Sequence, residues 1–189
     1  MIAWGERRRA ALARRRWRCR YGALAALGAA VLGLTMAWRP APVLVWNASA
    51  SAPLGLYRVR PGAPIETGDM VVVWLPGPAR ALADRRRYLP ANVPAVKRVA
   101  AAAGARVCAR GTAVWVGGRR VATRLAADHR GRPLPWWHGC RTLDSGEIFL
   151  LMRDSPDSFD GRYFGPSPRA DLIGRATLLW SPKPANVKP

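Results

Sequence analysis

The sequence predicts a mainly β protein, an antiparallel β domain preceded by one N-terminal helix. Short runs of β-branched and apolar residues recur beyond residue 55, each of strand length and each bounded by turn residues. No long amphipathic helical pattern and no internal repeat interrupts them. An uncharged run lies near the N-terminus instead, at residues 21–38, and its length suits a helix.

The composition limits the classes of partner. The chain has 189 residues, enough for one domain with a sizeable core, and a formal net charge of +20. Its 31 basic residues comprise 28 arginines and three lysines, a bias typical of a GC-rich coding sequence that also favours alanine and proline. Because the arginines are spread along the chain, we expect no dedicated nucleic-acid site.

The N-terminus predicts where the protein resides. Eight arginines fall in residues 1–20, and the uncharged run 21–38 would span about 27 Å as a helix, close to the thickness of a bilayer core. The excess of arginine before the run places the N-terminus in the cytoplasm. We therefore expect a single-pass bacterial inner-membrane protein with a periplasmic domain over 39–182 and a proline-rich tail over 183–189.

Two other interpretations of the run 21–38 stay open. It is rich in alanine and glycine, so it could be a cleaved signal peptide with residues 35–37 as the cleavage site. It could also be a helix buried in the core.

The expected strands follow in order along the exported part. They are LYRVR (56–60), MVVVWL (70–75), AVKRVA (95–100) and EIFLLMR (147–153). A hairpin is expected at TAVWVGGRRVAT, because two consecutive glycines supply the positive φ angles of a tight turn. Polar, proline- and arginine-rich insertions separate the strands at 76–94 and 128–137.

The stretch WNASASAPLGLYRVRPG (46–62) gathers small hydroxyl side chains just beyond the apolar run. In extended backbone, Ser49 and Ser51 point the same way. Taken alone the stretch is typical of a linker, unless another residue activates a serine. His129 and His138 belong to a separate insertion, so Lys97, inside an apolar run, is the better candidate base.

Lys97 is the one lysine outside the C-terminal tail. A lysine at a strand end usually extends its amine into solvent, which is the structural alternative here. To act as a base at neutral pH, its pKa must fall from about 10.4 to near 7, and burial among apolar side chains lowers a lysine pKa.

These motifs resemble the signal peptidase I superfamily, in particular the conjugative-transfer (TraF-type) signal peptidases. NASASAPLGLYRV resembles the serine box of that family, and the resemblance continues in order along nearly the whole exported chain. The further motifs are GDMVVVWLP (68–76), VKRVAAAAGARVC (96–108), GRPLPWWHGC (131–140) and GEIFLLMRDSPDSFDGRYFGP (146–166). The resemblance implies a signal peptidase-type antiparallel β catalytic domain.

The same resemblance implies roles for three residues at the reaction centre. Ser51 matches the nucleophile and Lys97 the general base. Ser49 matches a residue whose hydroxyl forms the oxyanion hole together with the Ser51 backbone N–H. Such a Ser/Lys pair requires no metal and no organic cofactor.

Three further residues match the last motif of the family. Ser158 matches a serine that orients the lysine, and Asp160 matches the acidic residue, followed by Arg162. Whether Asp160 tunes the lysine or pairs structurally with Arg162 stays open, with the pairing favoured. The chain departs from housekeeping relatives at Ala52, in place of Met, at Gly161, in place of Ser, and at residues 103–105, where Ala-Gly-Ala replaces Pro-Gly-Asp.

Cysteine usage agrees with export. Cys19 lies on the predicted cytoplasmic side, and Cys108 and Cys140 form an even pair in the exported part, where we expect a disulfide. A pair of buried thiols is the alternative. A zinc site made by both cysteines with His129 and His138 has suitable ligand types but an awkward spacing.

The resemblance implies a membrane-anchored serine endopeptidase that cleaves exported precursors, with a pilin or another conjugation or type IV secretion component as the client. The other hypothesis is a non-enzymatic basic scaffold of a conjugation apparatus.

Overall fold

A computed structural model describes residues 3–37 and 41–182. The predicted tail 183–189 therefore lies outside the described residues. The chain divides into two compact units, Met1–Ala41 and Pro42–Pro189. The first unit is one helix, α1 (Ala3–Ala37), which continues through both the arginine-rich segment and the apolar run.

The predicted transmembrane anchor is not supported. Within the described residues, no helix combines the length and the apolar character needed to cross a membrane.

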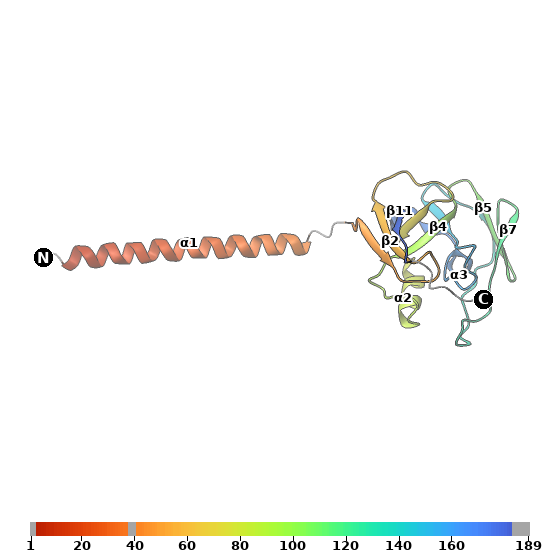
Figure 1. The fold of residues 1–189 in the computed structure, drawn as a ribbon, viewed down its shortest axis with the longest axis horizontal. Coiled ribbons are helices and arrows are strands. Elements are labelled where there is room, and N and C mark those ends of the chain that lie inside the picture. The colour runs from red at the N-terminus through yellow and green to blue at the C-terminus, as the bar shows by residue number, and fades with distance from the viewer. Residues whose placement is uncertain (1–2, 38–40, 183–189) are drawn as a thin grey trace. The chain divides into compact units, whose positions relative to one another are not determined.

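The second unit is built from antiparallel strands, as predicted (Figure 1). Seven strands form the larger sheet, in the spatial order β1 (Leu44–Asn47), β2 (Gly55–Arg60), β11 (Leu172–Trp180), β3 (Met70–Val73), β4 (Ala95–Ala101), β9 (Glu147–Leu150) and β10 (Ser167–Pro168). The smaller sheet has the order β7 (Arg119–Thr123), β6 (Ala113–Val116), β5 (Arg106–Arg110) and β8 (Gly139–Thr142). In Figure 1, β5 and β7 lie on the opposite side of the domain from β2.

The predicted strands and hairpin are present with small shifts of their ends. The runs 56–60, 70–75, 95–100 and 147–153 correspond to β2, β3, β4 and β9, and the last of these strands ends three residues earlier than predicted. Gly117 and Gly118 close the β6–β7 hairpin with φ angles of 56° and 80°. Both glycines therefore adopt the positive φ angles that were predicted for this turn.

The insertion 76–94 contains a helix that the sequence pattern did not predict, α2 (Gly77–Arg85). A proline in its first turn suits a helix start, and Ala79 and Ala83 form its buried face. Two short helical turns follow late in the chain, α3 (Gly161–Phe164) and a 3-10 turn (Arg169–Asp171).

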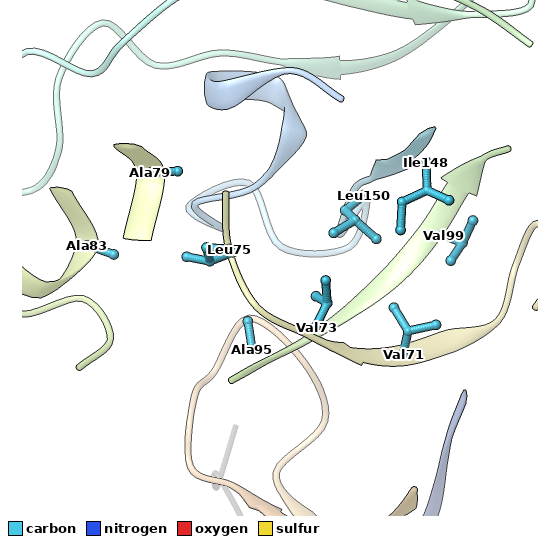
Figure 2. Close-up of a cluster of buried hydrophobic side chains, with 9 residues drawn as sticks. All are labelled: Val71, Val73, Leu75, Ala79, Ala83, Ala95, Val99, Ile148 and Leu150. Carbon is cyan, nitrogen blue, oxygen red and sulfur yellow. The ribbon is translucent and has the colours of Figure 1, made fainter. Parts of the chain in front are cut away.

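The central strands of the larger sheet are buried on both faces. One face carries a cluster in which the two α2 alanines pack beside Leu75 (Figure 2); its members are Val71, Val73, Leu75, Ala79, Ala83, Ala95, Val99, Ile148 and Leu150. The opposite face carries Ala52, Tyr57, Val59, Val72, Val96, Met152 and Ala176. Strand β4 contributes to both clusters, so a lysine in this strand is surrounded by apolar side chains.

Candidate active site

The serine-rich stretch forms a loop, residues 48–54, between the paired strands β1 and β2. Its two hydroxyls lie together, because Ser49 Oγ is 2.8 Å from Ser51 Oγ. The Ser51 backbone N–H also donates to Ser49 Oγ, at 3.3 Å. The loop thus presents two hydroxyls and one backbone donor at a single point, which a flexible linker would not do.

Lys97 extends from β4 to this point. Its side chain is only 4% exposed, so the interpretation as a solvent-directed strand-end lysine is wrong. The amine Nζ donates to Ser51 Oγ at 3.3 Å and to Ser158 Oγ at 2.8 Å. These contacts join three segments that are far apart in sequence: the β1–β2 loop, β4 and the loop after β9.

Burial changes the protonation of Lys97. Desolvation by the surrounding protein lowers the pKa of its amine from 10.5 to about 8; the Asp160 carboxylate raises it in part, and the Arg162 guanidinium lowers it. The pKa of Lys97 therefore stays about one unit above the value near 7 that the sequence analysis expected for a base at neutral pH. At pH 7 about a tenth of the molecules carry a neutral amine able to accept a proton.

Asp160 and Arg162 form a buried ion pair. Arg162 Nε lies 2.8 Å from Asp160 Oδ1, and both side chains are at most 2% exposed. Asp160 also accepts from the Met152 backbone N–H at 3.0 Å, and Arg162 donates to the carbonyl oxygens of Met152, Ser155 and Pro156. The pair therefore fixes the loop that carries Ser158, the hydroxyl that contacts the lysine.

The neighbouring glycine explains one departure from the housekeeping pattern. A Cβ on Gly161 would lie 2.6 Å from the Leu150 carbonyl oxygen and 2.9 Å from the Phe149 ring. A serine at this position would clash with β9 in its present place. In the Ala-Gly-Ala turn, Gly104 adopts a φ of 82°, which a glycine tolerates whatever residues flank it.

A cavity of about 690 Å³ opens beside the serines. Its wall comes from the end of β1 and the following loop, from the insertion before β4, and from the loop at 155–159. Ser49, Ser51, Lys97 and Ser158 all line it. The candidate nucleophile and base therefore face an open cavity that a substrate can enter.

Contacts around Asp128 tie the two insertions together beside this cavity. The Tyr88 hydroxyl donates to Asp128, and Arg132 donates to the same carboxylate with an Nε–Oδ2 distance of 2.7 Å. His129, at the rim, lies 3.7 Å from Asp157 and not beside the serines. The insertion carrying Tyr88 is therefore held as part of the cavity wall.

The cysteines follow the predicted pairing. Cys108 and Cys140 form a disulfide between directly paired positions of β5 and β8. Both the buried-thiol alternative and the zinc alternative with His129 and His138 are wrong, because the two sulfur atoms are bonded to each other. Among the described residues, no group of three or more His, Cys, Asp or Glu side chains could hold a metal ion.

Sequence reasoning missed Asn47, the last residue of β1. Its side chain is buried, and its amide makes four hydrogen bonds within the serine loop. An asparagine directly before a small-residue loop favours this kind of side chain to backbone bonding, and that was the available signal. The role of Asp128 had no comparable local pattern.

Several known proteins are similar to this chain. A family model described as signal peptidase, peptidase S26, matches residues 16–181. The plasmid transfer protein TraF of Escherichia coli is 34% identical over 147 residues, covering 71% of this chain and 82% of that protein. The probable conjugal transfer protein TraF of Sinorhizobium fredii is 36% identical over 148 residues, covering 72% and 77%.

One solved structure is also similar. A signal peptidase I from Enterococcus faecalis is 18% identical, with a TM-score of 0.36 over 61% of this chain and 98% of the other.

Proposed function

Because the chain belongs to the signal peptidase family, peptidase S26, we propose that it is a serine endopeptidase with Ser51 as nucleophile and Lys97 as general base. The family membership confirms the resemblance that the sequence motifs indicated. The observation that carries the proposal is the contact of a buried amine, with a lowered pKa, with a serine hydroxyl at 3.3 Å. A group with a lowered pKa that lies in a cavity beside a possible nucleophile is a candidate for a catalytic base.

The reaction begins with neutral Lys97. Its Nζ takes the proton of the Ser51 hydroxyl as Oγ attacks the carbonyl carbon of the scissile peptide bond. The oxyanion that develops accepts hydrogen bonds from the Ser51 backbone N–H and the Ser49 hydroxyl. In the structure without substrate, this N–H donates to the oxygen of that hydroxyl instead. The Lys97 ammonium then gives its proton to the leaving amine, and Ser51 retains the acyl group as an ester.

Water completes the cycle in the hydrolytic reaction. Neutral Lys97 takes a proton from a water molecule that attacks the ester, and the second oxyanion uses the same two donors. As the bond between the acyl carbon and Ser51 Oγ breaks, the Lys97 ammonium returns its proton to Oγ, and the acyl fragment leaves as a carboxylic acid. Ser158 supports both steps, because its hydroxyl, 2.8 Å from Nζ, keeps the amine directed towards Ser51. Asp160 and Arg162 act through the loop that they fix.

The substrate that we propose is the precursor of an exported protein. The relatives are named plasmid transfer and conjugal transfer proteins, which favours a component of a conjugation apparatus, and the resemblance of the sequence motifs implies a pilin as one such client. The cavity that Ser51 and Lys97 line is open and has room for part of an extended peptide segment. The Cys108–Cys140 disulfide supports an oxidising compartment such as the bacterial periplasm.

Replacing one hydroxyl tests the proposal. Coexpressed with candidate pilin precursors, the wild-type protein should generate processed products detectable by mass spectrometry, and Ser51→Ala should generate none. Ser145→Ala, which removes an exposed hydroxyl far along the chain, is the matched control and should process normally. Unchanged processing by a folded Ser51→Ala protein would favour the non-enzymatic basic scaffold instead.

A further inference from the structure

The loop between β1 and β2 is held in an unusual way. Asn47 and Gly55 form the last residue pair of the two strands, so residues 48–54 lie beyond the strand ladder. Within the loop, the Ala52 backbone N–H donates to the Ser49 carbonyl oxygen across a long 3.4 Å. The backbone alone therefore provides little to keep Ser51 in one position.

The Asn47 side chain supplies the hydrogen bonds that hold this loop beyond the end of the strand pairing. Its Nδ2 donates to the carbonyl oxygens of Ser49 at 2.9 Å, Ala52 at 3.1 Å and Pro53 at 3.1 Å. Its Oδ1 accepts from the Ser49 backbone N–H at 3.1 Å. One amide, 6% exposed, thus bonds to backbone groups on both sides of Ser51.

These bonds determine where the candidate oxyanion donors lie. Both the N–H and the carbonyl of Ser49 are held by the same amide, which fixes the backbone from which the Ser49 side chain extends. The peptide groups after Ser51 are held at Ala52 and Pro53, and the Tyr57 hydroxyl adds a second bond to the Pro53 carbonyl oxygen at 2.8 Å. Ser51 therefore lies between backbone groups that are held by hydrogen bonds on both sides, at Ser49 and at Ala52 and Pro53. Its own N–H is directed at Ser49 Oγ.

We propose that Asn47 is a positioning residue that sets the geometry of the nucleophile and the oxyanion donors. This inference rests on the proposed Ser51 and Lys97 chemistry and adds a residue to it. Asn47 acts through the loop, since its bonds reach backbone groups and not the hydroxyl of Ser51 or the amine of Lys97. Oxyanion donors act only when they are placed before the charge develops, and sites displaced by fractions of an ångström lose rate.

Asn47→Asp gives the sharpest test. The carboxylate keeps the shape of the side chain but presents an acceptor to three carbonyl oxygens, so the loop must move. We expect kcat on a peptide spanning a small-x-small cleavage site to fall on the order of 100-fold, the usual effect of losing an oxyanion donor. KM should change little, because the segment before β4, the start of β4 and the loop at 155–159 continue to form most of the cavity wall.

Two further measurements separate positioning from a general structural role. In the uncharged Asn47→Ser protein the pH midpoint of the remaining activity should match the wild type, because Ser158 and not Asn47 holds the lysine amine. The burst of p-nitrophenol released from p-nitrophenyl acetate should slow in parallel with kcat, because acylation of Ser51 forms the same oxyanion. Asn92→Asp, at an exposed position, adds the same charge and should behave as wild type.

Each outcome decides the matter. Wild-type kcat in a folded Asn47→Asp protein would overturn the role of Asn47 and leave the Ser51–Lys97 chemistry intact. Absence of Ser51-dependent cleavage and acylation in the wild type would overturn both. If Asn47→Asp does not fold, Asn47→Ser, which keeps one short donor, replaces it. A loss of kcat there with unchanged KM supports the proposal, and a joint loss of kcat, substrate affinity and melting temperature overturns it.

Discussion

The dependence of activity on pH follows directly from the burial of Lys97. Its pKa is lowered to about 8, and only the neutral amine accepts the Ser51 proton. The neutral fraction is about 1% at pH 6, about a tenth at pH 7 and about nine tenths at pH 9. The value of kcat/KM should therefore rise about tenfold per pH unit below pH 7, about fivefold between pH 7 and 8, and level off above 9, a total of about ninetyfold between pH 6 and pH 9.

The assay is cleavage of a fluorogenic peptide across this range, with melting temperature recorded at each pH. A midpoint near 6.5 would point to a histidine base, and a flat profile with cleavage that still needs Ser51 would exclude a titrating base altogether. Either result would refute the assignment of Lys97.

Three variants sharpen the measurement. Asp160→Asn should move the midpoint below 8, because the carboxylate raises the pKa of the lysine while Arg162 remains to lower it. Lys97→Arg should abolish the activity at every pH, since a guanidinium does not give up its proton in this range. Lys183→Arg, outside the described residues, is the matched control and should leave the profile unchanged.

Other consequences concern stability and substrate binding. Reduction of the Cys108–Cys140 bond, which spans 32 positions, should lower the free energy of unfolding by about 3–4 kcal/mol in urea titrations; equal transitions with and without reductant would contradict this. Gly161→Ala should lower the melting temperature because its Cβ meets a backbone carbonyl oxygen of β9; a melting temperature equal to the wild type would mean that β9 yields freely. Tyr88→Phe removes the hydroxyl bond to Asp128 and should raise KM severalfold with kcat unchanged, since it loosens only the cavity wall; an altered kcat with unchanged KM would place Tyr88 nearer the reaction.

Local pattern predicted the strands well because their signals are local. Apolar runs of strand length mark β2, β3, β4 and β9, and the paired glycines mark the β6–β7 hairpin. Helix α2 was not predicted because it begins with a glycine and a proline, residues that are typical of loops. Its stability comes from the burial of Ala79 and Ala83 against the sheet. The anchor was predicted from the length of the run 21–38 and its absence of charge, and no helix within the described residues is long and apolar enough to cross a membrane.

The site could be inferred only in part. Spacing alone could not join Ser51 to Lys97, which lies 46 positions away and reaches it through the pairing order of the larger sheet. The family resemblance supplied that link. The contacts of Asn47 could not be predicted from the sequence, since four hydrogen bonds from one amide depend on the path of the whole loop.

The electrostatics of the lysine show why the fold matters to the chemistry. Asp160 raises the pKa of Lys97 and Arg162 lowers it, so the buried pair acts on the amine with opposing signs, and desolvation is the leading effect. Because the folded-state pKa is below the unfolded value, the folded protein binds fewer protons between about pH 8 and 10.5, and its stability rises with pH through that window. At neutral pH the buried amine costs about 3 kcal/mol of stability. The same burial produces the base, so a core substitution that admits water to Lys97 should stabilise its ammonium and slow cleavage at neutral pH.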